Sequence, residues 1–192
     1  MPILKICCGV SGSGKTTWAE SLGVEWYNIN RDNHRFKLFC DGKHDRSLYK
    51  FTKERENQVT SRCNDDFNWA VHRELNIVVS NTNLNQKDIT YWQEKAESVG
   101  YEFEVKYFPI TFEDALKRDS KRGALAVGRE ILIQQWHKWL VISDYKTYTP
   151  NNSYLKLCGL IWMVLLPSIP PVGTTIMIKW VQIHQDLKLS LC

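Results

Sequence analysis

The sequence has little excess charge and no regular arrangement of cysteines. Its 25 Lys and Arg stand against 21 Asp and Glu, which leaves a formal charge of +4. This excess is too small for a protein that wraps nucleic acid by overall charge, and it favours an enzyme that meets anions at one place. The six cysteines form no C-x-x-C pair, which excludes a disulfide framework and a cysteine zinc site. No charged-then-apolar leader follows Met1, so we expect a reducing cytoplasm.

Low-complexity segments and internal repeats are also absent. With 43% hydrophobic and 24% charged residues, the chain can build a sizeable core. Strand-like and helical patterns alternate, which predicts a single α/β domain ending near Tyr145. The expected strands are 3–8, 24–29, 76–80 and 101–108, and the expected helices are 15–22, 49–73, 86–98, one from Phe112 and 128–141.

Two of these helices carry apolar stripes, and a third has a capping residue at its start. Thr111 is expected to cap the helix from Phe112, with Asp114 at its third position. Inward positions are expected at Phe51, Val59, Phe67, Trp69 and Val71 in the long helix, and at Ile131, Leu132, Trp136, Trp139 and Leu140 in the last.

The most specific motif is a glycine-rich stretch that matches G-x-x-x-x-G-K-[ST] between an expected strand and an expected helix. In such a loop the backbone N–H groups converge on phosphate oxygens at the positive end of a helix. Lys15 then bridges the outer phosphates, and the Thr16 hydroxyl is placed to bind Mg²⁺. The motif predicts ATP binding by Gly9, Ser11, Gly12, Ser13, Gly14, Lys15, Thr16 and Thr17.

A carboxylate and a cation follow the second expected strand. Strand ends on this side of a parallel sheet face the ligand crevice, so Asp32 is a candidate base for an acceptor hydroxyl. Arg35 lies one helical turn later and can hold a substrate phosphate. Alternatively, Asp32 caps the next helix and Arg35 is solvated. The sequence leaves both interpretations open.

A cluster of cations lies near residue 120. Lys117, Arg118, Lys121 and Arg122 precede Gly123, which suits a mobile lid that closes on a nucleotide. Taken alone, the cluster also fits a solvated helix end that complements its dipole.

Several segments together resemble the phage-type polynucleotide 5′-kinases over about residues 3–148. The resemblance implies an α/β fold, with a P-loop kinase-type parallel sheet flanked by helices and a short lid. It also implies transfer of the ATP γ-phosphate to the 5′-hydroxyl end of DNA or RNA, with Mg²⁺, in the host cytoplasm for a phage-encoded protein. The segments, in the family's order, are Gly9–Ala19, Tyr27–Asp32, Tyr49–Lys53, Thr82–Asn85 and Ser120–Gly123.

By position, the resemblance also assigns roles to residues of this chain. Lys15 and Thr16 hold phosphates and metal, and Asp32 activates the 5′-hydroxyl. Arg35 binds the phosphate 3′ of the terminal nucleotide, while Arg122 acts on the donor phosphates as the lid cation. Further substrate- or phosphate-binding positions are Arg118, Asn81 and Thr82.

One position departs from the family, which has Asp where this chain has Asn81. Asn keeps the shape and an acceptor oxygen but loses a charge near the metal and Arg35. We expect activity to be retained but reduced.

Two histidines and an aromatic run invite functional interpretations that the sequence does not favour. His34 and His44 lack partners at ligand spacing, so surface or loop positions are expected. Trp136, His137 and Trp139 could stack on bases, but their helical spacing favours the core.

The character of the chain changes after Asn152. Residues 157–178 contain no charge and are long enough to span a bilayer, but three prolines and Gly173 interrupt them. We instead expect a reading-frame error. In the frame that starts at each third base, Trp162-Met163-Val164 must encode Asp-Gly, and synonymous codons allow P-K-A-V-W-F-D-M-D-G-T around it. D-x-D-G-T is the nucleophile signature of haloacid-dehalogenase-type phosphatases, and in the resembling family a 3′-phosphatase of that type follows the kinase.

The sequence therefore predicts a kinase domain over 1–148 and, over 149–192, a linker and non-native apolar tail. Two other functions remain open. One is a P-loop kinase acting on a small molecule. The other is a nucleotide-dependent binding module or membrane-anchored switch. We expect nucleic acid 5′-hydroxyl ends as partners and no membrane.

Overall fold

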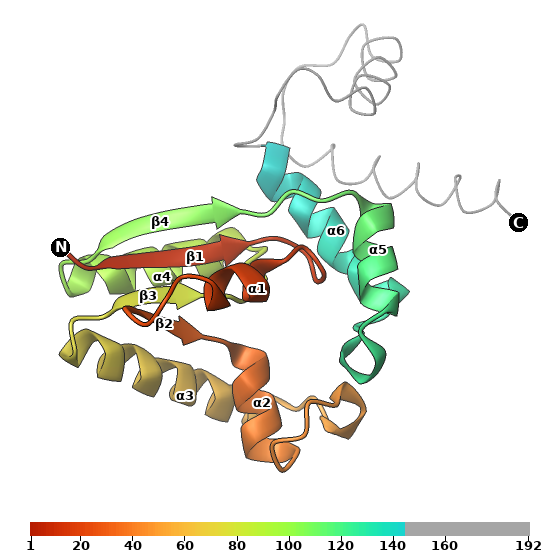
Figure 1. Ribbon diagram of the computed structural model, residues 1–192, viewed down its shortest axis with the longest axis horizontal. Coiled ribbons are helices and arrows are strands. Elements are labelled where there is room, and N and C mark those ends of the chain that lie inside the picture. The colour runs from red at the N-terminus through yellow and green to blue at the C-terminus, as the bar shows by residue number, and fades with distance from the viewer. Residues whose placement is uncertain (145–192) are drawn as a thin grey trace, which may run out of the picture. The chain divides into compact units, whose positions relative to one another are not determined.

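The computed structural model describes residues 1–144, which form a parallel sheet with helices on both faces (Figure 1). Its strands are β1 (Ile3–Cys8), β2 (Trp26–Ile29), β3 (Asn76–Val79) and β4 (Glu102–Tyr107). Its α-helices are α1 (Lys15–Glu20), α2 (Arg31–Phe39), α3 (Lys53–His72), α4 (Gln86–Ser98), α5 (Phe112–Ser120) and α6 (Arg129–Asp144). Two short 3₁₀ turns are η1 (Arg46–Leu48) and η2 (Gly123–Leu125).

The sheet has the strand order β2-β3-β1-β4, and every pairing is parallel. The central strands β1 and β3 are covered on both faces, which explains their continuous apolar runs. In register, Ile6 lies opposite Val79 on one side and Val105 on the other. Because all strands run the same way, their carboxyl ends meet at one edge, beside α2 and α5 (Figure 1).

Two helical layers bury the sheet. Helices α3 and α4 pack on one face through a core that includes Phe67, Trp92 and Ile77. Helix α1 covers the other face, where Ala19 meets Cys7 and Val78. The loops at the carboxyl edge therefore follow strands that are packed between two helical layers.

A further cluster joins α5 and α6 to the start of the phosphate loop. Val10, which directly follows Gly9, is buried with Ala115 of α5 and with Leu132 and Trp139 of α6. This packing places the cation cluster of α5 beside the glycine-rich loop.

The structure confirms the α/β prediction and most element positions, and the expected helix 86–98 coincides with α4. The cap by Thr111 is also confirmed, since its hydroxyl accepts the Asp114 N–H at 3.1 Å. The long helix begins later than expected, at Lys53, because the Thr52 hydroxyl accepts the Arg55 N–H and caps it there.

Three of the expected inward positions are wrong. Phe51 is 70% exposed because it precedes the helix, so helical periodicity does not apply to it. Trp69 and Ile131 are each 44% exposed. The stripe of α6 instead runs through Leu132, Trp139 and Ile142.

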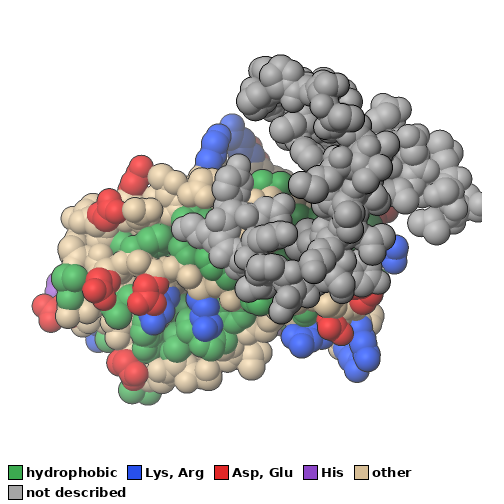
Figure 2. All heavy atoms as spheres, turned by 90° about the horizontal axis from the view of Figure 1, so that it is seen from above, with side chains coloured by type: hydrophobic (Ala, Val, Ile, Leu, Met, Phe, Trp, Pro, Cys, Tyr) green, Lys and Arg blue, Asp and Glu red, His purple; other side chains and the backbone are tan. Residues whose placement is uncertain are grey.

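On the face seen in Figure 2, acidic and basic side chains lie beside one another among exposed hydrophobic ones. An ion pair joins two neighbouring strands, since Lys5 of β1 lies 2.9 Å from Glu104 of β4. Within residues 1–144 no helix is both long and apolar enough to cross a bilayer. The predictions for the linker and tail, including the apolar stretch 157–178, fall outside the described residues.

Candidate active site

The glycine-rich loop lies between β1 and α1, as the motif predicts. Gly14 has φ 97°, a left-handed conformation that glycine adopts without strain, at the position where the loop turns into α1. Lys15 is 7% exposed, and its Nζ donates to the Val10 carbonyl at 2.6 Å and the Ser13 hydroxyl at 3.2 Å. Burial lowers the pKa of Lys15 to about 8, and the charge of Arg122 acts in the same direction. The negative charge of a phosphate here would offset both effects, because it favours the protonated ammonium.

Two side chains that are distant in sequence hold the loop. The Gln135 Oε1 of α6 accepts the Ser11 N–H at 2.7 Å, and Arg118 of α5 donates to the Gly12 carbonyl at 3.3 Å. The sequence singled out Arg118 but not Gln135, because nothing in the local pattern links α6 to the loop.

A cleft of about 720 Å³ opens over this loop at the carboxyl edge of the sheet. It brings together most of the predicted site residues: Ser11, Gly12, Gly14, Lys15, Thr16, Thr17, Asp32, Arg35, Asn81, Thr82, Arg118 and Arg122. Gly9 and Ser13 do not line it, although Ser13 contacts Lys15. Phe51 and Ile131, which were expected in the core, line this cleft instead.

The structure shows that Asp32 does not cap α2. Asn30 is the residue that caps α2, since its side-chain oxygen accepts the N–H groups of Asp32 and Asn33 at 2.9 and 3.2 Å. The side-chain Nδ2 of Asn30 in turn donates to the Ser80 hydroxyl at 2.8 Å. The Asp32 carboxylate is therefore free of the helix end and turns into the cleft.

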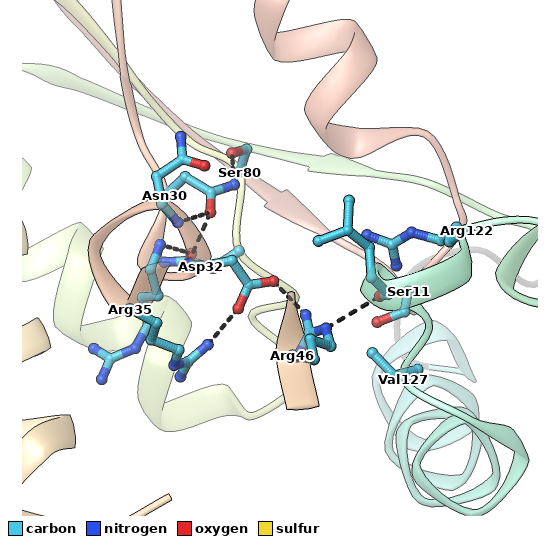
Figure 3. A network of polar contacts seen from close by, with 12 residues as sticks. Ser11, Asn30, Asp32, Arg35, Arg46, Ser80, Arg122 and Val127 are labelled. Atoms are coloured by element: carbon cyan, nitrogen blue, oxygen red, sulfur yellow. Dashed lines mark hydrogen bonds and ion pairs between the residues drawn. The ribbon is translucent and has the colours of Figure 1, made fainter. Parts of the chain in front are cut away.

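Two arginines engage the Asp32 carboxylate from opposite sides (Figure 3). Arg35 donates to Oδ1 at 2.6 Å, and Arg46 of η1 donates to Oδ2. Arg46 also donates through Nε to the Leu125 carbonyl of η2, at 3.1 Å. It therefore ties Asp32 of α2 to the segment that carries Arg122. Sequence analysis missed Arg46, because its partners lie in segments far from it in the chain.

A second carboxylate, Glu56 of α3, fixes Arg35 in place. Arg35 donates to both Glu56 oxygens at 2.9 and 2.8 Å, and Arg31 and the Tyr49 hydroxyl each donate at 2.8 Å. Burial alone would raise the pKa of Glu56, but the hydrogen bonds from Arg35, Arg31 and Tyr49 outweigh it and lower the pKa to about 2. Glu56 thus stays ionised and holds the guanidinium groups in fixed positions.

We expect Glu56→Gln to lower the free energy of unfolding at neutral pH by about 1–3 kcal/mol, because two guanidinium groups lose their anion. The folded-state pKa lies below the ordinary value of 4.5, so this stabilisation is complete above about pH 4.5 and is lost as the pH falls through about 2. Urea titrations of both proteins across this range measure the difference. Glu54→Gln, at an exposed position in the same helical turn, is the control. An equal loss in both variants, or a difference independent of pH, contradicts the prediction.

The lid cluster is organised by a buried carboxylate. Asp119 is 2% exposed and accepts the N–H groups of Val127 at 3.0 Å and of Gly128 at 2.9 Å. It also lies 3.5 Å from Arg122. The cluster is therefore more than a solvated helix end, since Arg118 and Arg122 face the cleft and Asp119 pins the chain that follows them. The sequence analysis gave Asp119 no role, although an acidic residue among four cations could have indicated a buried ion pair.

Asn81 and Thr82, which line the cleft, also make contacts that hold the fold together. Asn81 accepts the Arg31 N–H at 2.9 Å, and the Thr82 carbonyl accepts the Gly9 N–H at 3.1 Å.

His34 is not on a loop: it lies in α2 and contacts Asp66 at 2.8 Å. His44 packs against the ring of Phe36.

The aromatic run lies in α6, where Trp139 is buried, Trp136 is half-buried and His137 is exposed. Only the two tryptophans fit the expected core position.

The donor chemistry fits Mg²⁺ without a cage of protein ligands. Residues 1–144 contain no group of three or more His, Cys, Asp or Glu that could hold a metal ion. Magnesium often keeps several waters and takes few protein ligands when phosphates supply the rest. The Thr16 hydroxyl, at the first turn of α1 in the cleft, is compatible with this chemistry.

Together, the parallel sheet, the glycine-rich loop after β1 and the cations of α5 beside it define a P-loop nucleotide-binding domain. In agreement, the AAA domain family matches residues 4–139, and the chain belongs to this family.

A viral relative resembles the chain in sequence. A protein described as a putative bifunctional polynucleotide kinase/RNA ligase, from Autographa californica nuclear polyhedrosis virus, is 34% identical over 175 residues. The match covers 86% of this chain and 25% of that protein, so the chain spans about a quarter of its relative's length. This finding confirms the resemblance to polynucleotide kinases that the sequence indicated.

Solved structures share the fold. A Pnkp1/Rnl/Hen1 RNA repair complex matches with TM-score 0.57 and 19% identity, over 77% of this chain and 47% of that one. A second Pnkp1/Rnl/Hen1 complex matches with TM-score 0.52 and 22% identity, over 61% and 38%. At these identities the likeness concerns the fold alone.

Proposed function

We propose that this chain transfers the γ-phosphate of ATP to the 5′-hydroxyl end of a nucleic acid strand. One observation carries the proposal: a carboxylate, Asp32, lies in the same cleft as Lys15 and between two fixed arginines. Phosphoryl transfer to a hydroxyl needs a base for the acceptor and cations for the donor in one place. The viral relative, described as a polynucleotide kinase, supports a nucleic acid end as acceptor.

In the proposed reaction, the acceptor 5′-oxygen attacks the γ-phosphorus as its proton passes to Asp32. The bond from phosphorus to the β,γ-bridging oxygen breaks, and ADP leaves with that electron pair. Both Asp32 oxygens already accept a hydrogen bond, but a carboxylate has about four acceptor sites, so about two stay available, one of them for the hydroxyl.

The donor side would be held by the phosphate loop and the lid. Lys15 and the loop N–H groups bind the phosphates, and Arg118 and Arg122 approach from α5 and the turn after it. Gln135 holds the Ser11 N–H, so a phosphate must compete for that donor. When bound through Thr16, Mg²⁺ would neutralise charge that develops on the phosphates.

Transfer of labelled phosphate from ATP tests the proposal. We expect transfer to an oligonucleotide with a 5′-hydroxyl and none to the same oligonucleotide with a 5′-phosphate. Efficient labelling of free nucleosides instead would indicate a small-molecule kinase. ATP binding without transfer to any acceptor would indicate a nucleotide-dependent binding module.

Asn81 gives a prediction of its own. An Asp at this position keeps an acceptor for the Arg31 N–H and adds negative charge at the start of α2, in a cleft that Arg35 also lines. We expect Asn81→Asp to raise turnover about two- to fivefold, the effect of an interaction worth about 0.4–1 kcal/mol. Steady-state rates with a 5′-hydroxyl oligonucleotide measure it. An unchanged or lower turnover would show that the natural Asn costs nothing.

We further propose that residues 1–148 are the kinase domain and that 149–192 are a linker and frameshifted tail. The nucleotide sequence beyond the codon for Ser153 tests the frameshift. If no reading frame there encodes phosphatase motifs, the frameshift is excluded. We also propose a cytoplasmic location, as the resemblance to phage-type polynucleotide 5′-kinases implies.

A further inference from the structure

A second cavity of about 410 Å³ lies beside the cleft, between α3 and α4. Ligand sites commonly have volumes of about 300–1,000 Å³. We call this cavity the side chamber. It shares Arg31, Arg35, Asn81 and Thr82 with the cleft, whereas none of the glycine-rich loop lines it. The side chamber therefore adjoins the side of the cleft where Asp32 lies, which is the side proposed to take the acceptor.

Two oriented guanidinium groups stand at the boundary between the side chamber and the cleft. Arg35 donates three hydrogen bonds, to Glu56 and Asp32. Arg31 also donates three, to Thr60 and Glu56. Since a guanidinium has five N–H groups, each arginine has two without a partner among residues 1–144, and these can bind a ligand. The boundary thus suits an anion such as a phosphodiester.

The far wall of the side chamber combines an amide and an aromatic ring. The Asn64 oxygen of α3 accepts the Tyr91 hydroxyl at 2.6 Å and Lys95 at 2.7 Å. A lysine ammonium only donates, so these bonds orient the amide and leave its NH₂ group without a partner within residues 1–144. The Tyr91 ring is 39% exposed and rests edge-on against the buried Trp92, 5.2 Å between centroids.

We propose that the side chamber binds the second nucleoside of the acceptor strand. This inference rests on the proposed function. With the terminal 5′-hydroxyl at Asp32, the next phosphate is attached to the same ribose, and Arg35, which contacts Asp32 directly, is within reach of it. The strand then continues past Arg31 into the side chamber. There a base has a π face for Tyr91 and acceptor atoms for the Asn64 amide.

Two small acceptors test this inference. A nucleoside 3′-monophosphate has the 5′-hydroxyl and the phosphate but no second nucleoside, whereas a dinucleoside monophosphate has all three. We expect kcat/KM to be about tenfold or more higher for the dinucleotide, the contribution of one stacked base.

Two variants locate the effect. Tyr91→Ala and Asn64→Asp should each reduce the dinucleotide preference to about threefold or less, with kinetics on the 3′-monophosphate unchanged. Asn64→Asp keeps an acceptor for Tyr91 and Lys95, replaces the NH₂ donor with an oxygen, and adds a negative charge next to the Lys95 ammonium. Gln93→Ala, on the exposed face of α4, is the matched control and should change neither acceptor.

Each result has a separate meaning. Equal kinetics of wild type on both acceptors overturns the side-chamber inference and leaves the kinase proposal intact. If the variants impair the 3′-monophosphate as much as the dinucleotide, the side chamber serves the terminal nucleoside and the inference is wrong. If wild type transfers phosphate to no acceptor, the proposed function itself fails, and the inference with it.

Discussion

Replacing Asp32 with Asn is expected to lower kcat for phosphate transfer about 10²–10⁴-fold, the usual contribution of a general base. Asn keeps the size of the side chain and an oxygen for Arg35, but it cannot take the acceptor proton. The glycine-rich loop, which has no hydrogen bond to Asp32 in the described residues, stays intact. ATP binding by the variant should therefore change little.

Lys15→Ala is the matched comparison for this experiment. Lys15 is bonded within the phosphate loop, so its loss should weaken ATP binding as well as transfer. Equilibrium ATP binding and single-turnover transfer, measured on both variants, separate the two roles. If Asp32→Asn transfers phosphate at the wild-type rate, or loses ATP as Lys15→Ala does, Asp32 is not the base.

The second large effect is expected at Arg122. Its side chain lines the cleft over the phosphate loop and is loosely paired with Asp119, at 3.5 Å. A cation aimed at transferring phosphate stabilises the charge of the transition state. We expect Arg122→Ala to lower kcat by about 10²–10³-fold, with a smaller change in KM for ATP.

Lys121→Ala is the control, because Lys121 is the adjacent cation, is exposed and does not line the cleft. Its kcat should stay close to wild type. Comparable losses in the two variants would mean that the lid acts through its overall charge. Arg122→Lys should recover part of the rate, since it restores the charge without the planar donor group.

The arrangement of Asp32 shows why the site could be predicted only in part. The motif around Lys15 acts through neighbouring backbone atoms, so its spacing alone determines its geometry. Asp32 was found because the end of a parallel strand has a known place in the fold. Whether it caps α2 depended on Asn30 and Ser80, which meet across two strands. The sequence could not rank these competing hydrogen bonds.

The prediction that Phe51 points into the core is wrong for a local reason. Helical periodicity predicted it to be inward, yet Thr52 caps the helix one residue later and leaves Phe51 exposed at the cleft. There its ring lies 5.3 Å from the Arg35 guanidinium. The Thr52 cap places the start of the helix four residues later than the pattern predicted. Phe51 therefore lies before the helix, where helical periodicity does not predict burial.

The sequence by itself determined the alternation of strands and helices, the phosphate loop and the position of Asp32 after β2, because each depends on residues close together in the chain. Only the tertiary structure decided what surrounds that carboxylate. Arg46 reaches Leu125 across 79 residues, and Gln135 reaches Ser11 across 124. Such contacts form only once the sheet has brought its loops to one edge, so no local pattern encodes them.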